Sequence, residues 1–303
     1  MGNHHPMDVA VTGASGLIGG ALVNELKSNG HRVRRLVRDR KVASSDAIYW
    51  DPSRNEIDLA ALEGVNAVVH LAGESIADGR WTESRKLQIL KSRVEGTHLI
   101  ASSLAKLKVE PRVLVSASAI GAYGDRGDEW VDESSTLGDN FLAMVVKEWE
   151  GAAEPARIHG IRVVHPRTGI VLSKTGGALA KMMLPVRMGV GGRLGTGRQY
   201  MSWITLHDTV RALLFAITHE TLSGPVNVVA PNPVTNAEFT DTLARALRRP
   251  SFMPAPSFAL KLALGEMAQE LLLEGQRVAP AKLTSHNFEW AHPTFAEALR
   301  VCV

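Results

Sequence analysis

The feature that most constrains the fold is a glycine-spaced loop between a short apolar run and a helical pattern. Residues 9–12 read as a strand, and they lead directly into Gly13-Ala14-Ser15-Gly16-Leu17-Ile18-Gly19. Gly13 permits a tight turn, Gly16 lets backbone N–H groups approach a ligand, and Gly19 lets the helix lie close to the sheet. Because the positive end of a helix attracts anions, this loop predicts a binding site for the diphosphate of a dinucleotide.

Short apolar runs alternate with amphipathic segments along the first half of the chain, a pattern typical of a parallel sheet covered by helices. Six strands are expected, at Met7 to Thr12, Arg32 to Val37, Ile48 to Trp50, Ala67 to Leu71, Val113 to Ser116 and Arg162 to Val164. This order predicts an α/β fold with a Rossmann-type doubly wound parallel sheet.

A change of pattern after Arg167 predicts a second part of the molecule. Seven glycines crowd the stretch from Gly176 to Gly197 before helical and strand-like pieces resume. We therefore expect a Rossmann domain over residues 7–167, with parts of 205–230 returning to it, and a smaller C-terminal substrate lobe over 168–303. Residues 1–6 read as a linker or tag remnant, so the His4-His5 pair is left out of any metal argument.

The end of the second strand predicts which dinucleotide binds. An acidic residue there binds the ribose of NAD, whereas an arginine accommodates the additional phosphate of NADP. The sequence has Val37, Arg38 and Asp39, and a guanidinium offers a planar fork to a phosphate, so NADP is favoured over NAD. The alternative is that Arg38 faces solvent and Asp39 binds the ribose hydroxyls.

Composition excludes several other classes of protein. The formal net charge of the 303 residues is only +3, with cations and acids interspersed, so a nucleic-acid partner is not expected. No run of about 18 apolar residues exists, and no leader is apparent at the start, so no membrane association is expected. The single cysteine, Cys302, and the lack of paired histidine spacing favour a reducing cytoplasm and no metal site.

Several further motifs resemble the extended short-chain dehydrogenase/reductases. They are the loop at 12–19, His70-Leu71-Ala72-Gly73 and Val115-Ser116-Ala117-Ser118. A narrower resemblance, to the atypical branch called epimerase family proteins or nucleoside-diphosphate sugar epimerases, rests on Arg80-Trp81-Thr82, Ser92-Arg93-Val94-Glu95-Gly96-Thr97, Ala122-Tyr123-Gly124-Asp125, Gly195-Thr196-Gly197-Arg198-Gln199, Trp203-Ile204 and His207-Asp208. The resemblance spans nearly the whole chain.

The resemblance implies roles for matched positions. The loop glycines would hold the diphosphate, Arg38 the 2′-phosphate, Asp51 the adenine edge, and Leu71, Ala72 and Gly73 the backbone path beside the ribose and nicotinamide. Ser118, or alternatively Ser116, would hydrogen-bond a substrate oxygen. Lys147 stands where the family's active-site lysine serves the cofactor and catalysis.

Two departures from the family pattern bear on the chemistry. Ala143 occupies the position of the family's acid/base tyrosine, and alanine cannot transfer a proton. Tyr123 is an alternative acid if a nearby Lys147 lowers its phenol pKa, although it could equally be a packing residue. Arg93 replaces the family's asparagine, and it is expected either to neutralise a substrate or the cofactor diphosphate, or to be structural.

In the second lobe, Arg198 and Trp203 lie near the glycine-rich stretch and are substrate-contact candidates, Trp203 as a stacking surface. The alternative is a tight hairpin whose arginines face water.

Two functions from different classes follow from these residues. The first is an NADP-dependent oxidoreductase or epimerase-like enzyme that acts on a small carbonyl or alcohol substrate. The second is a dinucleotide-binding sensor that has lost its acid/base and signals through a partner. A homodimer through the helical segments 82–105 and 139–158 would suit the family.

Overall fold

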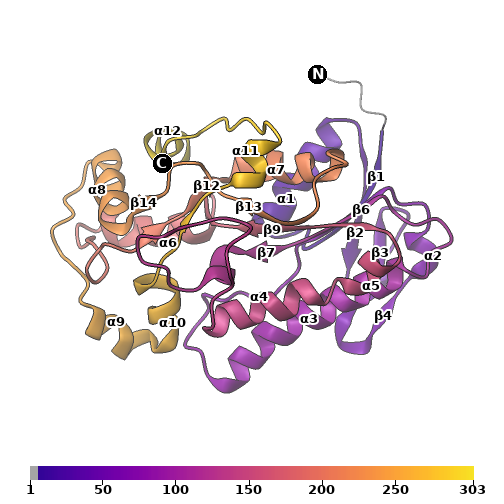
Figure 1. Ribbon diagram of the computed structural model, residues 1–303, viewed down its shortest axis with the longest axis horizontal. Coiled ribbons are helices and arrows are strands. Elements are labelled where there is room, and N and C mark those ends of the chain that lie inside the picture. The colour runs from indigo at the N-terminus through magenta and orange to yellow at the C-terminus, as the bar shows by residue number, and fades with distance from the viewer. Residues whose placement is uncertain (1–5) are drawn as a thin grey trace.

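The centre of the molecule is a nine-stranded sheet, seen in a computed structural model that describes residues 6–303 (Figure 1). The strand order is β13-β9-β6-β5-β1-β2-β3-β4, and β7 also pairs with β9. The bounds are β1 Asp8–Thr12, β2 Arg32–Val37, β3 Ala47–Asp51, β4 Glu56–Ile57, β5 Ala67–His70, β6 Val113–Ser116, β7 Ser118–Ala119, β9 Arg162–Thr168 and β13 Gly224–Val228. Every pairing is parallel except that of β3 with β4.

The Rossmann-type prediction is confirmed, because the chain winds outward from β1 in both directions. β2 and β3 lie on one side of β1, and β5, β6 and β9 lie on the other. The order reverses between β1 and β5, and this is where a doubly wound sheet opens a crevice for a ligand. One expected strand is longer than predicted, because residues 165–168 extend β9 to pair with β13 and β7.

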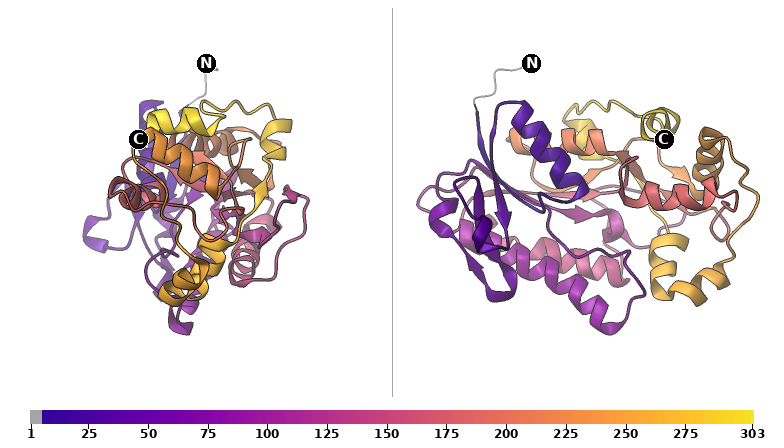
Figure 2. Two further views of the ribbon diagram at one scale, coloured as in Figure 1. Left: turned by 90° about the vertical axis from the view of Figure 1, so that its left-hand side faces the viewer. Right: turned by 180° about the vertical axis from the view of Figure 1, so that it is seen from behind.

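Helices cover both faces of the sheet, and the side-chain alternation of β1 shows why. Val9 and Val11 pack into a core with Leu22 and Leu213, whereas Ala10 belongs to the opposite core. The first face carries α1 Leu17–Ser28 and α7 Leu206–Thr218, and the second carries α3 Glu83–Leu104 and α5 Glu154–Ile158. α4 Phe141–Gly151 lies beside α3 (Figures 1 and 2).

A second core organises the C-terminal part of the chain. Trp203, Phe239 and Phe295 meet there, and α6 Gly177–Arg187, α8 Asn236–Leu247 and α12 Phe295–Cys302 contribute most of the other apolar side chains. Three small sheets pair β10 Ile170–Leu172 with β12 Trp203–Thr205, β11 Tyr200–Met201 with β14 Val234–Thr235, and β8 Trp130–Val131 with β15 Arg277–Val278. This lobe lies beside the sheet along the long axis of the molecule (Figure 1).

The last third of the chain also crosses between the two parts. α7 and β13 belong to the sheet, and α8 and α12 belong to the second core. The remaining short helices are α2 Leu59–Leu62, α9 Ser257–Leu264, α10 Glu266–Ala268 and α11 Ala281–Ser285, and one π-helical turn covers Gln269–Leu273. Among the described residues, no helix has both the length and the apolar character needed to cross a bilayer.

Candidate functional site

The glycine loop is closed tightly on its neighbours. Gly13 has φ +64°, and a Cβ there would lie 2.9 Å from the carbonyl carbon of Leu71. A Cβ on Gly19 would lie 2.1 Å from the carbonyl oxygen of Gly13, so side chains are excluded at both positions. Gly16 is the N-cap of α1 and provides no side-chain cap. The N–H groups of the first helical turn therefore remain available to an anion.

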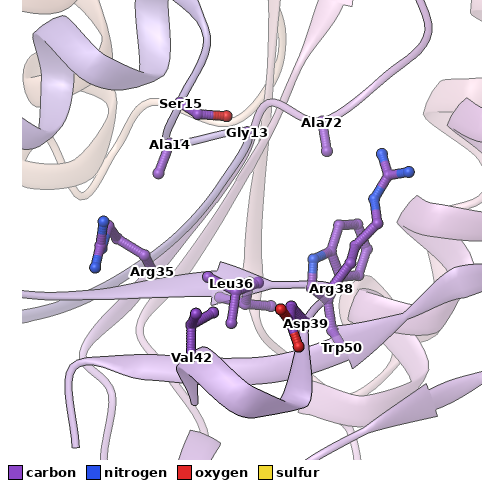
Figure 3. A pocket seen from close by; sticks show the side chains of 11 residues that line it. Gly13, Ala14, Ser15, Arg35, Leu36, Arg38, Asp39, Val42, Trp50 and Ala72 are labelled. Atoms are coloured by element: carbon purple, nitrogen blue, oxygen red, sulfur yellow. The ribbon is translucent and has the colours of Figure 1, made fainter. Parts of the chain in front are cut away.

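A cavity of about 330 Å³ opens beside this loop (Figure 3). Its walls are the loop on one side and the end of β2 on the other, with Trp50 and Ala72 at its edge; the lining residues are Gly13, Ala14, Ser15, Arg35, Leu36, Val37, Arg38, Asp39, Val42, Trp50 and Ala72. Two guanidinium groups thus border the cavity from β2 and the residue after it. Of these, Arg38 was expected, whereas Arg35 and Trp50 were missed.

The charged residues after β2 differ in whether they already have a hydrogen-bond or ion-pair partner within the protein. Asp39 caps a short helical turn by accepting a hydrogen bond from the Lys41 N–H at 2.9 Å. Arg40 pairs with Glu56 at 2.6 Å and stacks on a tyrosine ring. Within residues 6–303, no carboxylate pairs with Arg38, so its side chain in the cavity wall is free to meet a phosphate.

Asp51 does not line this cavity, although the resemblance implied that it would meet the adenine. Its carboxylate accepts hydrogen bonds from the N–H and hydroxyl of Ser53, which lower its pKa, and it thereby caps a helical turn. The residue that reaches the cavity wall is the preceding Trp50, which is almost fully buried. Alternation along β3 explains the difference, because neighbouring side chains point to opposite faces.

Thr12 and His70 position the backbone that follows β5, at the point where the strand order of the sheet reverses. The Thr12 hydroxyl oxygen accepts from the N–H groups of Leu71 and Ala72, and it hydrogen-bonds His70 Nδ1 at 2.8 Å. Burial lowers the pKa of His70 to about 4, so the ring stays neutral at physiological pH. Both residues end parallel strands, a signal that could have drawn attention to them.

Arg93 reaches from α3 to the segment that follows β5. Its guanidinium lies against Gly73, where a Cβ would be 3.6 Å from the Arg93 Cζ, and over the ring of Trp149 at 5.0 Å. Burial lowers the pKa of Arg93 to about 10. It donates one hydrogen bond to the Ile89 carbonyl, and in the described chain no carboxylate pairs with it. Arg93 is thus a partly buried cation with donors left for an oxygen-bearing group.

The three candidate catalytic side chains are not brought together. Lys147 is exposed on α4. Ser118 is buried, and its hydroxyl donates a hydrogen bond to the Glu150 carboxylate at 2.6 Å. Ser116 is wholly buried. The expected pairing of Tyr123 with Lys147 is wrong, because the tyrosine is 0% exposed and lies in the core.

Tyr123 instead belongs to a buried polar network. Its phenol donates to Asn227 at 2.7 Å and accepts from Arg167 at 3.2 Å. Arg167 forms two hydrogen bonds of 2.8 Å with the Glu150 carboxylate. Burial raises the pKa of Tyr123 despite the neighbouring guanidinium, so the expected lowering is also wrong. The network joins β7, α4, β9 and β13, and its role is to hold the sheet together.

The two candidates in the second lobe do not form a ligand surface. Trp203 is 0% exposed, donates to the Asn232 carbonyl and packs on Phe295, so it cannot stack on a substrate. β12 places the Trp203 side chain in the second core, among residues of α6, α8 and α12. Arg198 is exposed and lines no cavity described here. Its neighbour Gln199 lines a second, larger cavity between the sheet and this lobe.

A larger cavity, of about 790 Å³, separates the sheet from the second lobe. Arg93 and four residues of α4 line it from one side, and α6, α8 and the segment 264–276 line it from the other. Glu270, in the π-helical turn, accepts hydrogen bonds from the N–H groups of Phe141 and Leu142 at 3.1 and 2.9 Å. Burial raises the pKa of Glu270 despite these bonds. Its carboxylate thus lies at the N-terminus of α4, and no pattern in the sequence predicted this contact.

The described residues contain no group of three or more His, Cys, Asp or Glu side chains arranged to hold a metal ion. The His4-His5 pair lies outside them.

Comparison with known proteins gives the family. A model of the NAD dependent epimerase/dehydratase family matches residues 9–144, and a model of a domain of unknown function (DUF1731) matches residues 255–302. An epimerase family protein of Mycobacterium leprae is 46% identical over 291 residues, which cover 96% of this chain and 94% of that protein. An epimerase family protein of Bacillus subtilis is 36% identical over 297 residues, covering 97% of each chain.

Solved structures agree with this relationship. The crystal structure of human epimerase family protein SDR39U1 with NADPH has a TM-score of 0.88 and 35% identity, and the match covers 98% of this chain and 99% of that one. UDP-glucose 4-epimerase of Thermus thermophilus with NAD has a TM-score of 0.75 at 20% identity over 98% and 97% of the chains, which shows a shared fold. The chain therefore belongs to the epimerase family of extended short-chain dehydrogenase/reductases.

Proposed function

We propose that the protein binds NADP(H) and is an oxidoreductase or epimerase-like enzyme acting on a carbonyl or alcohol group. The observation that carries the proposal is the cavity in which the glycine loop faces two guanidinium groups, Arg35 and Arg38 (Figure 3). Asp39, the acid that would favour NAD, is engaged in capping a turn. The human relative crystallised with NADPH supports the same cofactor.

The residues present fit this cofactor. The N–H groups at the start of α1, after the Gly13–Gly16 turn, would hold the diphosphate, because no side chain caps this helix N-terminus. Arg38 and Arg35 would receive the 2′-phosphate. Leu71 and Ala72, fixed by Thr12, would flank the route toward Arg93. When bound, the nicotinamide supplies or accepts a hydride.

Glu270 is the group that we propose handles the proton. Ala143 cannot do so, and Lys147 faces solvent. The Glu270 carboxylate lines the larger cavity together with Arg93, and two backbone N–H groups orient it. Since burial raises its pKa, it can exchange protons closer to neutral pH than an ordinary carboxyl group.

The loss of the family tyrosine also favours a second function, a cofactor-binding sensor without turnover. NADPH oxidation measured across aldehydes, ketones and sugar nucleotides separates the two. Turnover excludes the sensor, and tight NADPH binding without turnover of any compound favours it.

Arg38→Ala tests the cofactor. A guanidinium–phosphate contact contributes about 1.5–3 kcal/mol, so the NADP⁺ affinity should fall about 10- to 100-fold while the NAD⁺ affinity stays constant. Arg40→Ala is the matched control, because Arg40 is paired with Glu56 and does not line the cavity. Calorimetric titration of both variants with both nucleotides measures this. Equal loss for NADP⁺ and NAD⁺, or no loss, would refute the assignment.

Glu270→Gln tests the proton transfer. On the best substrate from the screen, kcat should fall about 100-fold with unchanged NADPH affinity. In the direction of alcohol oxidation, the native rate should fall as the pH drops through the raised Glu270 pKa, because the protonated form cannot accept a proton. Glu266→Gln is the control, since Glu266 pairs with Lys86 outside the cavity. An unchanged pH profile in Glu270→Gln would exclude this role.

A further inference from the structure

We propose that the larger cavity takes a predominantly apolar carbonyl or alcohol compound, and not a nucleotide sugar. This inference rests on the proposed function for the reaction, and it adds the class of substrate. It depends on four features of the cavity: its apolar walls, the hydrogen bonds that its polar side chains already form, its charges, and the apolar side chains at its opening.

The walls of the cavity are mainly aliphatic and aromatic. α4 contributes Val145 and Val146, α6 contributes Met182, and α8 contributes Phe239 and Leu243. Apolar surface of this kind gains free energy from covering apolar ligand surface and gives nothing to sugar hydroxyls, which lose water on entry.

Several polar side chains in the walls are already hydrogen-bonded within the protein. Gln199 donates to the carbonyls of Leu194 and Leu272, at 3.1 and 2.7 Å. The Ser202 hydroxyl donates to the Gln276 carbonyl at 2.7 Å. A sugar has several hydroxyls that need partners, and an unpaired buried polar group costs about 1–3 kcal/mol. The arrangement therefore disfavours a polyhydroxylated ligand.

Asn236 shows the same commitment. Its side-chain oxygen accepts from the Leu194 N–H at 2.8 Å, and its amide nitrogen contacts the Met201 sulfur at 3.4 Å.

The charges of the cavity also disfavour a diphosphate. Its cations in the described chain are Arg93 and Lys181, and Lys181 is exposed and pairs with Asp78 at 3.3 Å. Two carboxylates, Glu270 and Glu274, line the same space and would repel a nucleoside diphosphate. One cation remains, and the free donors of Arg93 suffice for the single oxygen of a carbonyl or alcohol.

The mouth of the cavity is apolar as well. Val190 and Met253 line the cavity and yet are 46% and 48% exposed, so the opening lies between them. The backbone N–H of Ala255 bonds the Arg193 carbonyl, which holds these two segments side by side. Further exposed apolar side chains on the same segments and the adjoining helix α9 are Met188, Phe252, Phe258 and Leu262. These apolar side chains let a hydrophobic compound enter on this side of the cavity.

The test uses N-phenyl-1-naphthylamine, an uncharged apolar fluorophore, with NADPH-saturated protein. Ala178→Trp fills the cavity from α6, and Leu184→Trp is the matched control, because Leu184 lies on the same helix but faces solvent. We expect saturable binding to native protein, an affinity at least about tenfold weaker in Ala178→Trp, and no more than about a twofold change in Leu184→Trp. UDP-glucose should not displace the probe.

Three outcomes would overturn the inference. They are displacement of the probe by UDP-glucose, binding that Ala178→Trp leaves unchanged, and no saturable binding while NADPH still binds. Calorimetry with NADPH is run in parallel on each variant. A failure to bind NADPH would refute the proposed function, while the probe measured on nucleotide-free protein would still decide the nature of the cavity.

Discussion

Replacing Gly19 with alanine should weaken cofactor binding without unfolding the protein. The added Cβ would lie 2.1 Å from the Gly13 carbonyl oxygen, against the 3.4 Å of an ordinary contact. The start of α1 and the turn must therefore separate by the difference, about 1.3 Å, since close-packed interiors cannot absorb such an overlap. A backbone N–H to phosphate distance of about 2.9 Å would lengthen to about 4 Å, beyond hydrogen-bonding range.

The expected loss follows from the number of bonds affected. A hydrogen bond to a charged group contributes about 1.5–3 kcal/mol, so losing one lowers NADP⁺ affinity at least about 10-fold and losing two at least about 100-fold. Overpacking costs about 1–3 kcal/mol of stability, partly offset by the higher helix propensity of alanine.

Gly20→Ala is the matched control. The Cβ at position 20 would lie 3.6 Å from the Ala14 carbonyl oxygen, an ordinary contact. This variant should bind NADP⁺ as the native protein does and gain up to about 1 kcal/mol of stability. Calorimetric titration measures the affinities, and circular dichroism verifies folding. If folded Gly19→Ala binds within about twofold of native, the steric argument is refuted.

Two further predictions concern stability. The pKa of His70 is about 4 in the folded protein, against an ordinary value of 6.5 in the unfolded chain. As the pH falls from 6.5 toward 4, the unfolded chain binds a proton that the folded protein does not, so the free energy of unfolding should fall by about 3 kcal/mol in all. Urea unfolding should show this decline in native protein and a shallower one in His70→Gln; parallel curves would contradict it. Trp203→Ala should lower the free energy of unfolding by about 3–5 kcal/mol, because Trp203 fills the second core. A loss below about 1 kcal/mol in urea titration would show that the cavity collapses.

The sequence was most informative where local chemistry alone decides the structure. The strands at 32–37 and 113–116 have the predicted bounds. The second is a continuous apolar run, Val113-Leu114-Val115, of the kind that marks a parallel strand buried on both faces. The glycine loop could also be predicted, because Gly16 and Gly19 approach the backbone of Gly13 a few residues earlier in the same segment.

The sequence was least informative where residues far apart meet. Glu270 contacts residues 141 and 142, and no local pattern announces a contact across more than 120 positions. Tyr123 and Trp203 failed as site residues for the same reason, because aromatic side chains serve a core or a ligand equally well until their neighbours are known.

β13 lies far along the chain from β9, the strand with which it pairs, and this limits how the protein can be divided into fragments. Residues 7–168 hold the glycine loop and seven of the sheet's parallel strands, yet the outer edge of β9 is closed by a strand that begins more than fifty residues later. A fragment ending at residue 168 would expose the main-chain hydrogen-bonding groups of that edge and the apolar side chains that α7 covers. The nucleotide-binding half is thus not a detachable module, and truncations that divide the chain there should self-associate.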